Sequence, residues 1–178
     1  MEESVKIKVQ PLSAEAFQPV GRILERGQLI YPETEEGRVA MELLRIKHHP
    51  NGKFVSQLAI HFSYNQTFIP VQGSMVLIVT PAPRNRDADP ASYEFDYERT
   101  AAFVVEPGQV AHIDKGVWHS AVALGAECTY INVTRKNPRE QATEDGNEGR
   151  LERVSAARPY VGFVDLRKRD NRVIELEL

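Results

Sequence analysis

Cysteine is almost absent from this sequence, since Cys128 is the only one among 178 residues. A single cysteine excludes an internal disulfide framework and a thiolate metal cluster. We expect Cys128 to be a small buried side chain in a strand. The chain also lacks any apolar run near the ~20 residues that a membrane span needs. Its first residues, Met1 to Lys6, lack the apolar core of a secretory signal. We therefore expect a cytoplasmic protein with no membrane partner.

Neither sign of charge dominates, because the net charge is only −3. This balance predicts no nucleic acid and no anionic membrane as a partner. The sequence contains no Ser-His-Asp order, phosphate loop, CxxC pair or dinucleotide fingerprint. A hydrophobic content of 42% over 178 residues is enough for one domain, 1–178, with a real core.

Short apolar or alternating runs separated by Gly and Pro turns fill most of the chain. Strands are expected at 6–10, 39–47, 54–61, 67–69, 74–80, 93–97, 101–105, 120–124, 128–134, 160–166 and 172–178. Ser13 is expected to cap a short helix over 13–17. So many short strands favour a β-sandwich or barrel over a βα repeat. The expected core covers about 5–135. A C-terminal extension, 136–178, begins with a polar connection over 137–150. An edge strand in it could pair with a second copy, and a homodimer is the default expectation.

The stretch 108–119, Gly-Gln-Val-Ala-His-Ile-Asp-Lys-Gly-Val-Trp-His, has the most informative local pattern. Gly108 and Gly116 allow the backbone geometry of a hairpin corner. After this turn His119 takes an inward strand position, and Trp118 points the other way by alternation. A histidine that is merely part-buried at the end of a hairpin is the alternative.

A second histidine also precedes a glycine turn, in the pattern His61-x4-Gln66-x6-Gly73. Together, His61, Gln66 and His119 provide two neutral imidazoles and a carboxamide oxygen. Such a set can hold a divalent ion such as Ni, Zn or Mn, although weakly, because none of these ligands is anionic. A metal-free polar pocket in which Gln66 hydrogen-bonds a substrate is the alternative. His112 is expected at the rim or on the surface.

Three further side chains are candidates for binding a small carboxylate substrate. Lys115 lies in the second glycine turn and can act as a point charge on a flexible stem, or simply be solvated. Tyr130 and Asn132 alternate along one strand and should share a face, either inside or outside.

The motifs His61-x4-Gln66-Thr-Phe-Ile-Pro70-x2-Gly73 and Gly116-Val-Trp-His119 resemble those of the cupin superfamily. Within it, they resemble the ureidoglycolate lyase family of allantoin (purine) degradation. The opening Val9-Gln-Pro-Leu-Ser-x-Glu-Ala-Phe17-x3-Gly21 is similar to the start of such chains, and the resemblance spans about 7–135. It implies a mainly β, cupin-like (jelly-roll) barrel with a short N-terminal helix and few other helices.

The resemblance implies a lyase that cleaves ureidoglycolate to glyoxylate and urea. Such a reaction needs a base, a donor for the leaving nitrogen and a cation for the carboxylate. His119 or His61 would be the base or a metal ligand, Lys115 the cation, and Gln66 would orient the urea or hydroxyl group.

Two departures from the family pattern leave other functions open. Family members usually carry an acidic residue at position 59 and His-Pro at 61 and 62, where this chain has Ala59 and Phe62. One alternative is a divergent cupin lyase, isomerase or hydrolase acting on another small hydroxy or sugar acid. The other is a non-catalytic barrel that binds a small molecule.

Overall fold

The computed structural model describes residues 2–34, 38–48, 52–85, 93–136 and 161–178. Its strands are β1 (Glu3–Pro11), β2 (Gly21–Ile23), β3 (Arg38–Lys47), β4 (Phe54–Val55), β5 (Gln57–His61), β6 (Gln66–Gln72), β7 (Met75–Thr80), β8 (Ala101–Val105), β9 (Ala111–Ile113), β10 (Trp118–Ala123), β11 (Glu127–Lys136), β12 (Val161–Asp165) and β13 (Arg172–Glu177). The helices are α1 (Ala14–Phe17) and α3 (Leu166–Asp170), with a 3-10 turn at Tyr97–Arg99. The predicted mainly β fold with a short N-terminal helix is confirmed.

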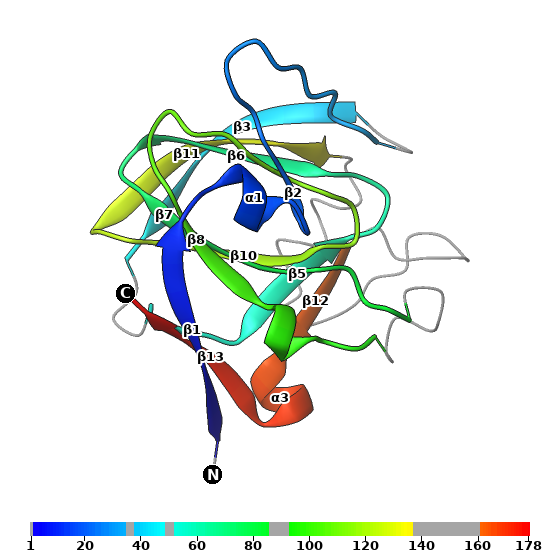
Figure 1. Ribbon diagram of the computed structural model, residues 1–178, viewed down its shortest axis with the longest axis vertical. Coiled ribbons are helices and arrows are strands. Elements are labelled where there is room, and N and C mark those ends of the chain that lie inside the picture. The colour runs from blue at the N-terminus through cyan, green and yellow to red at the C-terminus, as the bar shows by residue number, and fades with distance from the viewer. Residues whose placement is uncertain (1, 35–37, 49–51, 86–92, 137–160) are drawn as a thin grey trace.

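The described strands form two sheets that curl into a barrel (Figure 1). The eight-stranded sheet has the order β12-β5-β10-β7-β8-β1-β13-β4, and the five-stranded sheet has the order β2-β9-β6-β11-β3. No helix among the described residues is long and apolar enough to cross a membrane.

Side chains inside the barrel form the first core, and β7 shows how the sequence makes it. Met75, Leu77 and Val79 point between the sheets and pack with Phe103 and Tyr130. Because successive strand residues face opposite ways, the intervening residues of β7 reach the outer face of the eight-stranded sheet, where they join a second core. β7 is therefore buried on both faces, which explains its unbroken apolar run.

The C-terminal residues complete the larger sheet. β13 lies between β1 and β4, running parallel to β1, and β12 forms the edge beside β5. The predicted strands at 160–166 and 172–178 thus correspond to real strands, although α3 replaces the end of the first one. The predicted connection over 137–150 lies outside the described residues.

The expected strand at 93–97 is wrong. Asp96 caps a 3-10 turn instead, since its side chain accepts a hydrogen bond from the Arg99 backbone N–H at 3.2 Å. Aromatic residues favour strands, which is why the sequence predicted one. Here they pack in a core instead of joining a sheet. Tyr93 and Phe95 belong to the second core, where they cover the outer face of the eight-stranded sheet.

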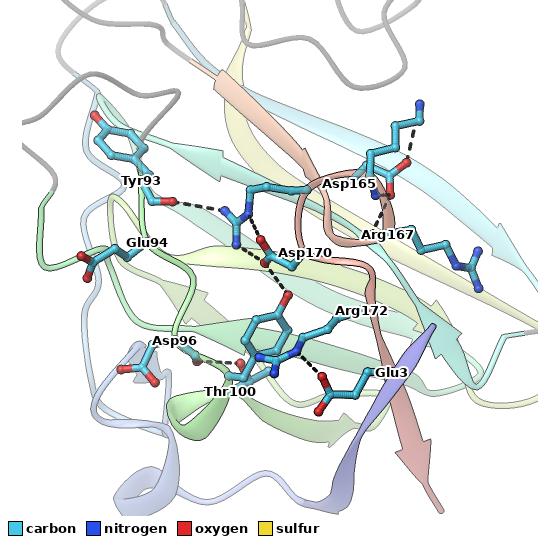
Figure 2. A network of polar contacts seen from close by, with 12 residues as sticks. Glu3, Tyr93, Glu94, Asp96, Thr100, Asp165, Arg167, Asp170 and Arg172 are labelled. Carbon is cyan, nitrogen blue, oxygen red and sulfur yellow. Dashed lines mark hydrogen bonds and ion pairs between the residues drawn. The ribbon is translucent and has the colours of Figure 1, made fainter. Parts of the chain in front are cut away.

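A network of polar contacts ties α3 to this covering segment (Figure 2). The Tyr97 hydroxyl donates to Asp170 Oδ2 at 2.6 Å, and Arg169 makes a two-pronged pair with the same carboxylate at 2.9 and 2.6 Å. Arg169 also donates to the Tyr93 carbonyl at 3.1 Å. The hydrogen bond from Arg169 is the largest cause that lowers the pKa of Asp170. The carboxylate therefore joins the helix to the aromatic cover.

Replacing Asp170 with alanine is expected to lower the free energy of unfolding by about 1–2 kcal/mol, because it leaves the Tyr97 hydroxyl and Arg169 without their shared acceptor. Denaturation in urea at pH 7 measures this. Glu3→Ala is the matched control, since it removes the exposed partner of Arg172 and should have a much smaller effect. Equal effects of the two variants would show that the network adds nothing beyond an exposed ion pair.

Candidate functional site

Glycine turns position the strands that carry the candidate site. Gly73, Gly108 and Gly116 have φ values of 70°, 89° and 79°, the left-handed region that favours glycine. The Gly116 N–H donates to the His61 carbonyl at 2.6 Å. This contact brings the second glycine turn directly beside His61, the histidine of the first motif.

Four polar side chains meet inside the barrel. We call His61, Gln66, His119 and Asn132 the buried polar cluster. His61 and His119 come from β5 and β10 of the eight-stranded sheet, while Gln66 and Asn132 come from β6 and β11 of the five-stranded sheet. All four are 5–8% exposed, and the two imidazole centroids are 4.8 Å apart. The cluster therefore bridges the two sheets.

Hydrogen bonds connect three members of the cluster in a chain. His61 Nε2 lies 2.8 Å from Gln66 Oε1, and Gln66 Nε2 donates to Asn132 Oδ1 at 2.8 Å. Because the amide oxygen carries no proton, His61 Nε2–H must be the donor. This arrangement fixes both amide orientations and makes the His61 ring a donor toward the cluster.

His119 is in the other tautomer, with its proton on Nδ1 and not on Nε2. Its Nδ1–H donates to the Val117 carbonyl at 3.0 Å, so its Nε2 carries the lone pair. Burial lowers the pKa of His119 to about 4, and the hydrogen bond to Val117 opposes this shift only in part. At neutral pH His119 is therefore a neutral imidazole that can accept a proton or a hydrogen bond at Nε2.

Tyr130 and Asn132 share the inward face of β11. The Tyr130 ring stacks on Phe68 with centroids 5.9 Å apart, and the Phe68 and His119 rings form a T-shaped pair with centroids 6.0 Å apart. Burial, with smaller contributions from the charges of Cys128 and Glu42, raises the pKa of Tyr130 to about 12. The phenol stays protonated at neutral pH and remains a hydrogen-bond donor.

Glu42 is an inward acidic residue that the sequence analysis missed. It is the register partner of Asn132 across β3 and β11, so both side chains lie on the same face of the sheet. Its Oε2 atom is shielded from solvent, and its charge contributes to the raised pKa of Tyr130. The inner wall of the barrel therefore has a carboxylate beside the cluster, on the side opposite the two histidines.

Arg135 is a second missed residue, a buried cation at 2% exposure. It donates to Ser63 Oγ at 3.0 Å, and its guanidinium carbon lies 5.6 Å from the centroid of the Tyr64 ring. Tyr64 stacks on His61 with centroids 4.4 Å apart. Arg135 is thus linked to the cluster through one aromatic ring.

Lys115 lies apart from the cluster, in a cleft of about 390 Å³ beside the loop 24–34. Its Nζ is 3.3 Å from Glu33 Oε2. His112 lines the same cleft but is only 1% exposed, and its Nδ1 lies 2.8 Å from Thr67 Oγ1. The expectation of a rim or surface histidine is therefore wrong, because the loop covers the outer face of β9.

The donor set is a poor match to a resident metal ion. The cluster offers two imidazoles and two carboxamides, and no three His, Cys, Asp or Glu side chains in the described ranges form a group that could hold a metal. His61 Nε2 and Gln66 Oε1 are also engaged with each other. The weakly bound metal and the metal-free pocket both stay predictions.

The two curled sheets, with a histidine cluster between them, define a cupin-like β-barrel protein. The ureidoglycolate lyase family model matches residues 27–154, and the chain belongs to this family. It is 30% identical over 122 residues to a protein of Agrobacterium fabrum (strain C58 / ATCC 33970) named "putative ureidoglycolate lyase", covering 64% of this chain and 72% of that protein.

Solved structures with a similar arrangement are more distant. L-ribose isomerase from Acinetobacter sp. DL28 in complex with L-ribose has a TM-score of 0.47 and 15% identity, covering 79% of this chain and 65% of the isomerase. The dTDP-4-dehydrorhamnose 3,5-epimerase from Elizabethkingia anophelis NUHP1 has a TM-score of 0.40 and 10% identity, covering 57% of this chain. The chain spans about half of that epimerase, 53% of its length.

Proposed function

We propose that this protein is a cytoplasmic lyase that cleaves ureidoglycolate to glyoxylate and urea. Family membership supports the reaction class. The observation that supports it in this chain is a neutral acceptor, His119 Nε2, in a ring 4.8 Å from that of His61, whose Nε2–H is held by Gln66 Oε1.

The reaction breaks a carbon–nitrogen bond in a compound whose central carbon carries a hydroxyl, a carboxylate and a urea nitrogen. His119 Nε2 accepts the hydroxyl proton, the carbon–oxygen bond becomes the aldehyde of glyoxylate, and the electron pair of the breaking bond goes to the urea nitrogen. That nitrogen needs a proton, which the imidazolium of His119 can return. In this proposal Gln66 and Asn132, which are oriented by their mutual hydrogen bond, bind the urea amides.

The substrate carboxylate needs a cation, and Lys115 and Arg135 are the two candidates. Lys115 is the predicted one, but a carboxylate must compete with Glu33 for its ammonium group. Arg135 is the other candidate. Its guanidinium group lies over the Tyr64 ring, and that ring stacks on His61. A buried guanidinium binds a carboxylate more strongly than a solvated ammonium does. Arg135→Lys and Lys115→Ala should therefore differ in KM, and the larger rise identifies the carboxylate site.

A lyase, isomerase or hydrolase for a different small hydroxy or sugar acid is the second candidate. Ala59 is the register partner of His119, so the methyl group of Ala59 lies beside the base on the same face of the sheet. An acidic side chain is absent at that position, and the inward carboxylate of Glu42 lies on the other sheet. Such a change in wall chemistry favours a substrate with a different polar group at that point.

The decisive experiment is glyoxylate release from racemic ureidoglycolate by the purified protein. The rate is corrected for spontaneous decay and measured as purified, after chelation, and with added Ni, Zn or Mn. Enzyme-dependent release that survives chelation supports a lyase that works without a metal. Release only with added metal supports a lyase with a metal cofactor. Background rates under all conditions would reject the lyase and direct attention to other small acids. Thermal stabilisation by such an acid without turnover would identify a binding protein.

A further inference from the structure

Apolar side chains surround the proposed base. Ala59 on β5 and Val79 on β7 are the register partners of His119 on its two sides, so all three face the interior of the barrel. From the opposite sheet, the Phe68 ring forms a T-shaped pair with the imidazole, with centroids 6.0 Å apart. Burial in these surroundings lowers the pKa of His119 to about 4. The part of the barrel beside the base therefore offers apolar contacts to a substrate.

The polar groups opposite the base are mainly hydrogen-bond donors. Gln66 Oε1 accepts from His61 Nε2–H, and Asn132 Oδ1 accepts from Gln66 Nε2. Each carboxamide oxygen therefore already has one donor. Among the described residues nothing accepts from the Asn132 amino group, so it keeps two protons for a ligand and Gln66 Nε2 keeps one. Tyr130, on the same face of β11 as Asn132, adds a protonated phenol. This wall suits an oxygen of the substrate better than an amino group.

The urea half of ureidoglycolate contains a carbonyl oxygen and a terminal amino group, and the site treats them differently. The carbonyl oxygen accepts hydrogen bonds, which Gln66 Nε2 and Asn132 Nδ2 supply. The terminal amino group must donate two hydrogen bonds, but each carboxamide oxygen has only one lone pair left. Beside the base it would meet the methyl group of Ala59 and the Phe68 ring. Burying an amino group there without acceptors is unfavourable.

We propose that the same site also cleaves N-acyl-α-hydroxyglycines, in which an apolar group such as a methyl replaces the terminal amino group of ureidoglycolate. The inference rests on the proposed lyase function, because the reaction is the same and only the leaving group changes. His119 Nε2 takes the hydroxyl proton, and the carbon–oxygen bond becomes the aldehyde of glyoxylate. The carbon–nitrogen bond breaks with its electron pair going to the amide nitrogen, which takes the proton. The products are glyoxylate and a carboxamide, and no co-reactant is needed.

The acetyl compound is a sharp probe because its methyl group has nearly the size and shape of the amino group that it replaces. The comparison with ureidoglycolate therefore measures hydrogen bonding at that point and not room. A site that hydrogen-bonds a substrate group rejects the analogue that lacks it by ~10⁴–10⁵, whereas an apolar pocket distinguishes isosteric groups by only ~10². The two kinds of wall thus predict substrate preferences that differ by orders of magnitude.

The test compares kcat/KM for glyoxylate release from racemic N-acetyl-α-hydroxyglycine and racemic ureidoglycolate, each divided by the uncatalysed rate constant of that compound. The value for the acetyl compound should equal or exceed that for ureidoglycolate, or lie below it by less than about tenfold. A larger preference for ureidoglycolate would overturn the inference and leave the proposed function intact. Loss of that preference in Glu42→Gln would then identify Glu42 as the acceptor for the amino group. Release from neither compound would reject both proposals, and release from the acetyl compound alone would reject only ureidoglycolate as the substrate.

Ala59→Asp tests the wall itself, because it adds a hydrogen-bond acceptor beside the base. The ratio of the two substrates within one variant is independent of folded yield and of any change in the pKa of His119, since both substrates use the same base. This ratio should shift toward ureidoglycolate by at least about tenfold. The matched control is Ala126→Asp, the same change at an exposed alanine in the turn between β10 and β11, and it should leave the ratio unchanged. An unchanged ratio in Ala59→Asp would show that the leaving group does not lie beside this wall and would overturn the inference.

Discussion

Replacing His119 with alanine is expected to lower kcat for glyoxylate release by a factor of ~10²–10⁴, the usual loss when a general acid–base group is removed. The reason is positional, since Nε2 of His119 carries the lone pair that faces the cluster while Nδ1 is held by the Val117 carbonyl. Steady-state kinetics on ureidoglycolate measure the change. Full activity in the variant would remove His119 from the mechanism.

His119→Asn separates catalysis from folding. The asparagine amide can replace Nδ1–H in the bond to Val117 but has nothing at the position of Nε2, so the fold should persist while activity is lost. His48→Ala, at an exposed histidine, is the control and should be fully active. Because the pKa of His119 is about 4, its protonation should produce no inflection in kcat/KM between pH 5 and 8. An inflection in that range that disappears in His119→Asn would contradict this assignment.

The same depressed pKa has a consequence for stability. The unfolded chain binds a proton at His119 near its usual pKa of 6.5, while the folded chain does so only near 4. The unfolded state therefore holds more protons between these values, and stability falls as the pH decreases from 6.5 toward 4. His119→Asn should show a shallower decrease over this range in urea denaturation.

Gly73→Ala is expected to lower the free energy of unfolding by more than about 3 kcal/mol. Gly73 has a φ of 70°. A Cβ built there would lie 2.3 Å from the Glu127 carbonyl oxygen, a backbone atom that cannot move without shifting β11. Denaturant unfolding, or failure to accumulate folded protein, measures the effect.

Gly108→Ala is the matched control for this prediction. Its φ of 89° is just as unfavourable for an alanine, but nothing lies within 4 Å of the added Cβ. The left-handed conformation alone should cost about 1–2 kcal/mol. The difference between the two variants isolates the clash with β11, and similar losses would mean that the Gly73 turn relaxes freely.

Much of the fold and part of the site could be predicted from residue patterns. The strand over 101–105 has the predicted boundaries, because an apolar run of this length between polar residues is typical of a strand and too short for a helix. Trp118 joins the outer core and His119 the interior, as alternation requires. Cys128 is fully buried in its strand.

Other parts depend on faces that periodicity could not assign. In β3 both alternating sets contain apolar residues, Met41 and Leu43 on one face and Leu44 and Ile46 on the other. The pattern therefore could not show that Glu42 faces the interior. The short strands β2 and β9 contain only three residues each, and the rest of the sheet determines their pairing. The burial of His112 likewise depends on a distant loop.

β3 and β11 of the five-stranded sheet carry polar side chains on one face and apolar side chains on the other. Glu42 and Asn132 line the barrel, while Met41, Leu43, Ile131 and Val133 lie on the reverse. Because neighbouring residues of a strand face opposite ways, a substitution on the outer face that shifts the backbone of β3 or β11 also moves the side chains that line the barrel.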